Sequence, residues 1–146
     1  MTPIRLLVSG LLAATTIGWH SHAARAQEAF SDREGQIEFN LPSHNIGCIF
    51  TPLGGTSWYK PRSGGPELSC DRVKPAYVKM ELGPTGPARR INNPGERACC
   101  GTSNILAYRK VWRGGPFTCK SGLSGITCLR GDGHGFVLGR TKIMAN

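Results

Sequence analysis

The sequence contains no apolar run long enough to cross a bilayer comfortably. The longest extends from Leu6 to Trp19, whereas a membrane-spanning helix needs roughly 20 apolar residues. It is followed by Ala24-Arg25-Ala26, which places small residues where a signal peptidase reads them. We therefore predict a cleaved signal helix over residues 1–26, with an uncleaved N-terminal anchor as the alternative, and no transmembrane segment after processing.

Recognisable catalytic and cofactor motifs are also missing. The sequence has no His-Glu-x-x-His, no phosphate-binding Gly-x-x-x-x-Gly-Lys-Ser/Thr and no dinucleotide fingerprint. Its nine acidic residues are scattered and form no local pair of the kind that glycoside hydrolysis uses. These absences leave no assigned catalytic residue and no expected cofactor, and they favour a non-catalytic protein.

Histidine is scarce, since only His44 and His134 lie beyond the predicted signal. A Ser/His/Asp triad built from Ser124, His134 and Asp132 is conceivable. However, Gly122-Leu123-Ser124-Gly125 is not the Gly-x-Ser-x-Gly elbow of such enzymes, and we predict that it forms a hairpin turn. A small secreted hydrolase that uses His134 is therefore an alternative hypothesis.

Uninterrupted segments of helical length are absent, because 20 glycines and 10 prolines punctuate the chain. Short stretches with strand character lie between these breaks, and their spacing predicts a small antiparallel sandwich or barrel. We expect a polar lead-in over residues 27–36 and a single all-β domain over residues 37–146. The predicted strands lie at 37–41, 46–50, 77–82, 105–108, 117–119, 126–129 and 136–138, and residues 117–129 are expected to form a hairpin.

Six cysteines lie beyond the predicted signal, and they are the most informative residues present. An exported chain of this size with six cysteines is typical of a disulfide-stapled domain in an oxidising compartment. Zinc-binding Cys-x₂₋₄-Cys spacing does not occur, so no metal site is predicted. Thioredoxin-type spacing is absent as well, which argues against a redox-active pair. The six are Cys48, Cys70, Cys99, Cys100, Cys119 and Cys128.

Cys119–Cys128 is the best single predicted pair, because a hairpin would bring these residues face to face. Adjacent cysteines such as Cys99 and Cys100 rarely bond to each other, because the resulting ring strains the peptide unit between them. Two arrangements then remain. Either this vicinal bond forms together with Cys48–Cys70, or Cys48 and Cys70 pair separately with Cys99 and Cys100. We slightly favour the second arrangement.

Positive charge is concentrated toward the C-terminus. Residues 86–146 carry ten Lys/Arg against two acidic residues, whereas residues 27–85 carry six against seven. Such asymmetry suggests an acidic partner. Nucleic acid is not expected outside the cytoplasm, so an anionic envelope polymer or a carbohydrate fits better. The alternative is a basic surface that serves only solubility, since the charges are dispersed singly.

Exposed aromatic side chains beside cations are typical of surfaces that bind carbohydrates or aromatic ligands. Trp58 and Tyr59 lie in a Gly/Ser-rich segment, whereas we expect Trp112 to be a core residue. The candidate binding residues are Trp58, Tyr59, Arg109, Lys110, Arg113 and His134.

The most distinctive short string is Asp132-Gly133-His134-Gly135-Phe136. Glycines beside a histidine can bring the backbone close to a ligand, but they are also typical of a tight turn. We expect a turn here, with Phe136 buried where the following strand enters the core.

Several of these strings occur together in a recognisable order. They are Phe39-Asn40-Leu41-Pro42-Ser43-His44-Asn45-Ile46-Gly47-Cys48, Cys70-Asp71, Cys99-Cys100-Gly101, Leu106-Ala107-Tyr108, Trp112-Arg113-Gly114, Phe117-Thr118-Cys119-Lys120-Ser121, Gly125-Ile126-Thr127-Cys128 and Gly133-His134-Gly135-Phe136. In them the chain resembles a family of small secreted bacterial cysteine-rich proteins of unknown function. Arg109 and Gly139-Arg140 depart from the Gly and Ser-Arg that this family usually has. The resemblance implies a bacterial, exported, disulfide-bonded domain and adds no catalytic residue.

The sequence therefore predicts a periplasmic or extracellular, non-catalytic binding or envelope-interaction module. A small secreted hydrolase and a purely structural envelope protein are the alternatives.

Overall fold

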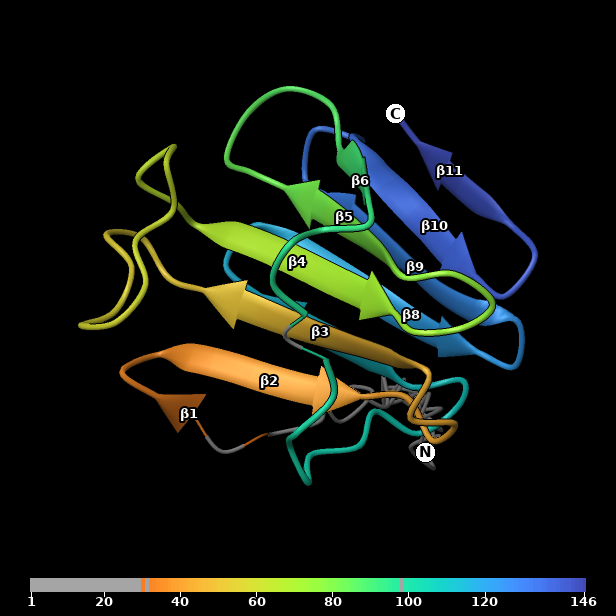
Figure 1. The fold of residues 1–146 in the computed structure, drawn as a ribbon. Helices are drawn as coiled ribbons and strands as arrows, with labels where there is room; N and C mark the ends of the chain where they lie inside the picture. Colours follow the sequence, from red (N-terminus) through yellow and green to blue (C-terminus); the bar gives the residue numbers. More distant parts are fainter. Residues whose placement is uncertain (1–29, 31, 98) are drawn as a thin grey trace, which may run out of the picture.

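The computed structural model describes residue 30, residues 32–97 and residues 99–146. The predicted signal helix over residues 1–26 lies outside the described residues. The described chain forms two antiparallel sheets that pack face to face as two layers (Figure 1). The prediction of an all-β antiparallel sandwich is therefore confirmed. None of the described segments forms a helix long and apolar enough to cross a membrane.

Both sheets follow the order of the chain, and within each sheet every strand pairs with its neighbours in sequence. The connection from β6 to β7 carries the chain from the first sheet to the second. The first sheet contains β1 (Asp32–Arg33), β2 (Gln36–Asn40), β3 (Ile46–Thr51), β4 (Glu67–Arg72), β5 (Val78–Leu82) and β6 (Arg89–Asn92). The second contains β7 (Val111–Gly114), β8 (Phe117–Gly122), β9 (Gly125–Arg130), β10 (Gly135–Gly139) and β11 (Ile143–Ala145).

The core lies between the two layers and is built from alternate residues of the strands, as the period-two geometry of a strand requires. On β3, for example, Ile46, Cys48 and Phe50 face inward and are buried. Trp112 on β7 is 1% exposed, and its ring centroid lies 5.1 Å from that of Phe39 and 5.6 Å from that of Phe50. The expectation that Trp112 is a core residue is confirmed.

Two local predictions for the second sheet are also confirmed. β8 and β9 form the predicted hairpin, with Cys119 directly opposite Cys128. Before β10, Gly133 has a φ of 92°, a conformation that glycine adopts without steric cost. This turn leads into Phe136, which is buried.

The structure corrects the predicted strand at residues 105–108. Ile105 makes only an isolated bridge to Asn40, because this segment runs alongside β2 as part of the connection between the sheets. β1 and the first residue of β2 lie within the segment predicted as a polar lead-in. β4, β6, β7 and β11 lie where no strand was predicted. Sequences such as Glu-Leu-Ser-Cys-Asp-Arg of β4 are rich in polar residues, so neighbouring strands rather than intrinsic preference determine their conformation.

Candidate functional site

One end of the sandwich carries a cleft with a volume of about 380 Å³. Turns from both sheets surround it: the β2–β3 and β4–β5 connections of the first sheet, and the β8–β9 and β10–β11 turns of the second. A volume in this range is typical of small-molecule sites. The polar side chains of its lining include His44, Asn45, Lys74, Tyr108 and Arg140.

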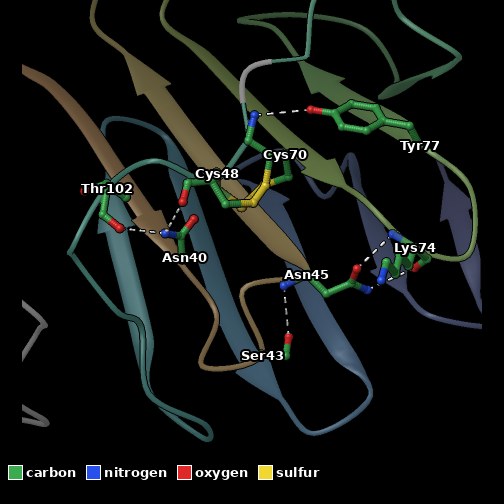
Figure 2. Close-up of a disulfide and its surroundings, with 10 residues drawn as sticks. Asn40, Ser43, Asn45, Cys48, Cys70, Lys74, Tyr77 and Thr102 are labelled. Carbon is green, nitrogen blue, oxygen red and sulfur yellow. Dashed lines mark hydrogen bonds between the residues drawn. A yellow bond between two sulfur atoms is a disulfide. The ribbon is translucent and has the colours of Figure 1, made fainter.

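Asn45 fixes the backbone of Lys74 at the edge of this cleft. The Asn45 Oδ1 accepts the Lys74 N–H at 2.8 Å, and the Asn45 Nδ2 donates to the Lys74 carbonyl oxygen at 2.9 Å (Figure 2). The Asn45 carbonyl also accepts the N–H of Val73 at 2.9 Å. These bonds join the β2–β3 turn to the β4–β5 connection, so Lys74 has a set position while its side chain stays exposed.

Arg72 fixes the backbone of Arg140 in a similar way. The Arg72 Nη1 donates to the carbonyl oxygens of Gly139 at 2.8 Å and Arg140 at 3.2 Å, while Nε and Nη2 both donate to the Ala76 carbonyl oxygen. A buried guanidinium is costly unless its donors are satisfied. Arg72 therefore stays buried because backbone carbonyls receive its hydrogens, and in doing so it positions the exposed Arg140.

Backbone bonds to β8 hold the segment that carries Tyr108. The Arg109 N–H donates to the Ser121 carbonyl oxygen, and the Ser121 N–H donates to the Lys110 carbonyl oxygen, both at 3.0 Å. Arg109 has a φ of 68°, a left-handed conformation that turns the chain immediately after Tyr108. Two predicted binding residues, Arg109 and Lys110, therefore lie next to the cleft but outside its lining.

Cations dominate the charge of the cleft. Lys74 and Arg140 approach it from different sheets, and none of the described lining residues is Asp or Glu. Val73 and Leu123 are exposed and supply apolar surface, and Tyr108 adds a hydroxyl and a ring. Such a lining can hold an anionic group by charge and hydrogen bonds while the rest of a ligand contacts the apolar wall.

Trp58 and Tyr59 lie at the opposite end of the sandwich, on the β3–β4 connection. The Trp58 Nε1 donates to the Gln36 Oε1 at 3.3 Å, and the guanidinium carbon of Arg33 lies 4.3 Å from the centroid of the Trp58 ring. The Tyr59 hydroxyl donates to the Glu67 Oε1 at 2.7 Å. Burial and this bond raise the pKa of Tyr59 above its usual range.

Arg113 and His134 are also remote from the cleft. Arg113 donates from Nη1 to the Thr118 Oγ1 at 2.9 Å beside the β7–β8 turn. His134 lies on the β9–β10 connection, where its N–H donates to the Asp132 Oδ1 at 3.2 Å. The predicted binding residues therefore do not converge on one concave surface. The elements that carry them place Arg109 and Lys110 at one end of the sandwich and Trp58, Tyr59, Arg113 and His134 toward the other.

The conceivable Ser/His/Asp triad is not assembled. Ser124 lies in the turn before β9 and His134 lies beyond its other end, a separation of roughly 20 Å at the usual rise of a strand. The Asp132 carboxylate is engaged by Arg130, whose Nε and Nη2 donate to it at 3.0 Å and 2.6 Å. These contacts make the Asp132 carboxylate an anchor for a buried arginine.

The cysteines pair as Cys48–Cys70, Cys99–Cys100 and Cys119–Cys128. The predicted Cys119–Cys128 pair is confirmed, but the favoured pairing of Cys48 and Cys70 with Cys99 and Cys100 is wrong. Cys48 and Cys70 lie directly opposite each other in the register of β3 and β4, on the inward face of the sheet. Cys99 and Cys100 cannot reach them there, because they lie against Gly47 on the outward face.

A buried carboxyl lies beneath the Cys99–Cys100 disulfide. Asp71 on β4 is 1% exposed, and this burial is the main reason that its pKa rises to about 6. Lys79 and a hydrogen bond from the Tyr77 hydroxyl lower the pKa of Asp71 and so limit the rise. The Tyr77 hydroxyl in turn accepts the N–H of Cys99 at 3.2 Å (Figure 2). Across the described part of the chain, no three His, Cys, Asp or Glu side chains gather closely enough to hold a metal ion.

Sequence reasoning from the residues alone did not single out Lys74, Arg72 or Asp71. Their roles depend on which residues of other strands and turns lie beside them in the fold, and no local sequence motif encodes that arrangement. Asn45 and Tyr108 do lie within the strings that carry the family resemblance, and these strings were the one sequence signal for this end of the molecule. Comparisons of the chain with protein-family models, with curated proteins and with solved structures find no match.

Proposed function

We propose that the protein is an exported, non-catalytic module that binds an anionic polysaccharide of the bacterial envelope in the cleft between the β4–β5 and β10–β11 turns. The main observation that supports this proposal is the positive charge of the cleft. Lys74 and Arg140 face it from different sheets, and no carboxylate among the described lining residues offsets them.

The rigidity of the cleft supports this proposal. Asn45 and the buried Arg72 hold the backbones of Lys74 and Arg140 through hydrogen bonds of 2.8–3.2 Å. A preorganised site loses less conformational freedom on binding than a flexible one. Two exposed cations on fixed backbones are therefore suited to repeated, moderate contacts with a charged polymer.

Export is part of the proposal. Two disulfides join adjacent strands on the core face of each sheet, and such bonds persist in oxidising compartments such as the bacterial periplasm. The predicted signal peptide and the resemblance to secreted bacterial cysteine-rich proteins also support export. We therefore place the binding event in the periplasm or outside the cell.

The test uses residues 27–146 and a soluble polyuronate as the anionic probe, with neutral dextran as the uncharged control. We expect binding at low ionic strength that weakens as salt is added, because exposed charges are screened. Lys74→Ala and Arg140→Ala should each weaken binding roughly fivefold, which corresponds to about 1 kcal/mol. Arg113→Ala removes a cation at the other end and should leave affinity unchanged.

The alternatives predict different results. Equal weakening by Arg113→Ala would indicate a diffuse basic surface in place of a cleft site. Binding to vesicles of anionic lipid but not to polyuronate would assign the site to the membrane surface. Equal binding to dextran and polyuronate, or binding that salt does not change, would overturn the proposal of an anionic ligand.

A further inference from the structure

The three disulfides differ in exposure and in the length of chain that they enclose. The four cysteines of Cys48–Cys70 and Cys119–Cys128 are at most 2% exposed, whereas Cys99 and Cys100 are only half-buried. A disulfide stabilises a fold largely by closing a loop in the unfolded chain, and adjacent residues close almost none. Cys99–Cys100 is thus the most exposed of the three pairs and the one whose loss costs the fold least.

The two sulfurs of this pair pack against Gly47 on β3. A Cβ atom at this position would lie 2.9 Å from the Cys99 Sγ, 3.0 Å from the Cys100 Sγ and 2.6 Å from the Asn40 Oδ1. A glycine at position 47 therefore leaves one small space that both sulfurs and the Asn40 oxygen surround. The cavity there has a volume of about 10 Å³, and Asp71 lines it as well.

Two buried acceptor atoms on residues that line this cavity lack a donor. The Asn40 Oδ1 and the Asp71 Oδ1 have no hydrogen-bond partner among the described residues, and both side chains are 1% exposed. Buried polar atoms are normally paired, so each exception calls for a cause. A disulfide has no hydrogen to donate, whereas the corresponding dithiol offers two S–H groups.

These acceptors are held in place by their own side chains. The Asn40 Nδ2 donates to the carbonyl oxygens of Cys100 at 3.1 Å and Thr102 at 2.7 Å (Figure 2). The Asp71 carboxyl is hydrogen-bonded to Tyr77, whose hydroxyl also binds the backbone of Cys99. Asn40 therefore cannot turn away without breaking its bonds to the segment that carries the disulfide, and Asp71 cannot turn away without breaking its bond to Tyr77.

We propose that Cys99–Cys100 is a reversible thiol–disulfide exchange site for a small dithiol, with Asn40 and Asp71 as the acceptors that stabilise its reduced form. A thiolate of the reagent attacks one sulfur of the pair, the bond between Cys99 and Cys100 breaks, and the released thiolate takes a proton. The reagent's second thiolate then attacks the reagent sulfur of the mixed disulfide and releases the second cysteine. The reagent leaves as a cyclic disulfide, and its two protons are balanced by those now on Cys99 and Cys100.

The test equilibrates residues 27–146 with a graded series of reduced to oxidised dithiothreitol ratios. Alkylation and peptide mass analysis then give the redox state of each pair. We expect Cys99–Cys100 to be half reduced at a ratio at least about 100-fold lower than either other pair, because exposed disulfides are more easily reduced than buried ones. Tryptophan fluorescence should show that the fold persists over this range.

Asp71→Asn tests the role of the buried acceptor, because it removes the negative charge at nearly constant size. Hydrogen bonds to a charged acceptor are stronger than those to a neutral one, so the variant should stabilise the reduced cysteines less. The ratio of reduced to oxidised dithiothreitol at which Cys99–Cys100 is half reduced should therefore rise roughly tenfold. Glu67→Gln makes the same chemical change on the same face of β4, outside the cavity lining, and should shift nothing.

Three results would overturn the inference. They are reduction of all three pairs over the same range, loss of the folded fluorescence when Cys99–Cys100 alone is reduced, and equal midpoints for Asp71→Asn and Glu67→Gln. The double variant Cys99→Ser/Cys100→Ser checks the assignment, because it should fold and lack only the most reducible transition.

Discussion

The Arg72 guanidinium on β4 donates to the carbonyl oxygen of Gly139 on β10 at 2.8 Å, so a buried cation of one sheet is bound by the backbone of the other. Arg130 on β9 makes the reverse connection at the other end. Its Nη1 and Nη2 donate to the carbonyl oxygens of Gly83 at 2.6 Å and Gly86 at 2.8 Å. Each sheet therefore contributes one buried arginine, and the hydrogen bonds of the two arginines connect the sheets at both ends of the sandwich.

Replacing Arg72 by methionine should destabilise the fold by about 2–4 kcal/mol, because the carbonyl oxygens of Gly139, Arg140 and Ala76 lose their donors. Arg72→Lys should recover only part of this loss, since an ammonium group cannot reproduce the planar array of guanidinium donors. Urea unfolding followed by tryptophan fluorescence measures both effects. The matched control is Arg90, an exposed arginine on β6, whose substitution by methionine should change stability by less than about 0.5 kcal/mol. Equal losses at the two positions would contradict the structural role of Arg72.

Asp71 should make folding stability fall as the pH rises. Its pKa is about 6 in the folded protein against a usual 3.8, so between these values the folded state holds a proton that the unfolded state has released. The stabilising contribution is complete below about pH 4 and is lost as the pH rises through about 6.

Asp71→Asn removes this titration. Relative to the wild type, the variant should gain up to about 3 kcal/mol between about pH 4 and pH 8, since each unit of pKa shift corresponds to about 1.4 kcal/mol. Urea unfolding across this range checks the slope, with Glu67→Gln as the control that should follow the wild type. A constant difference between Asp71→Asn and the wild type would contradict a raised pKa at Asp71.

The disulfides should contribute to stability in the order of the chain that they enclose. Cys48–Cys70 spans 22 residues in sequence and Cys119–Cys128 spans nine, which corresponds to about 3.4 and about 2.6 kcal/mol in the chain-entropy description. Replacing each pair by alanine and measuring the free energy of unfolding tests this order. Removal of Cys99–Cys100 should cost less than either. Peptide mapping without reduction would contradict the pairing if it linked Cys48 to Cys99 or Cys100.

Phe136 and His134 should respond very differently to substitution by alanine. Phe136 is 2% exposed in the core, so its truncation should cost roughly 3–5 kcal/mol. The His134 side chain is only half-buried. The backbone at this position donates its N–H to the Asp132 Oδ1 and accepts the N–H of Arg130 at its carbonyl oxygen. His134→Ala should therefore cost much less. Thermal unfolding of both variants separates these cases, and an equally large loss at His134 would show that its imidazole supports the fold.

The all-β class, the β8–β9 hairpin with Cys119 opposite Cys128, and the burial of Trp112 and Phe136 could be predicted from the sequence alone. These features depend on local signals, because alternating apolar residues define the buried face of a strand and glycines mark the turns between strands. The strands that local signals missed, such as β4 and β6, have polar sequences whose conformation depends on pairing with neighbours.

The pairing of Cys48 with Cys70 and the position of the cleft could not be predicted from the sequence, because both depend on how the sheets assemble. The long β3–β4 connection leaves the register of these strands undetermined in the sequence, and that register places Cys48 opposite Cys70. Lys74 and Arg140 belong to different sheets, and they meet because the layers are stacked and Arg72 binds across them. Contacts between distant segments depend on how whole sheets pack, and a pattern confined to one strand carries no record of that packing.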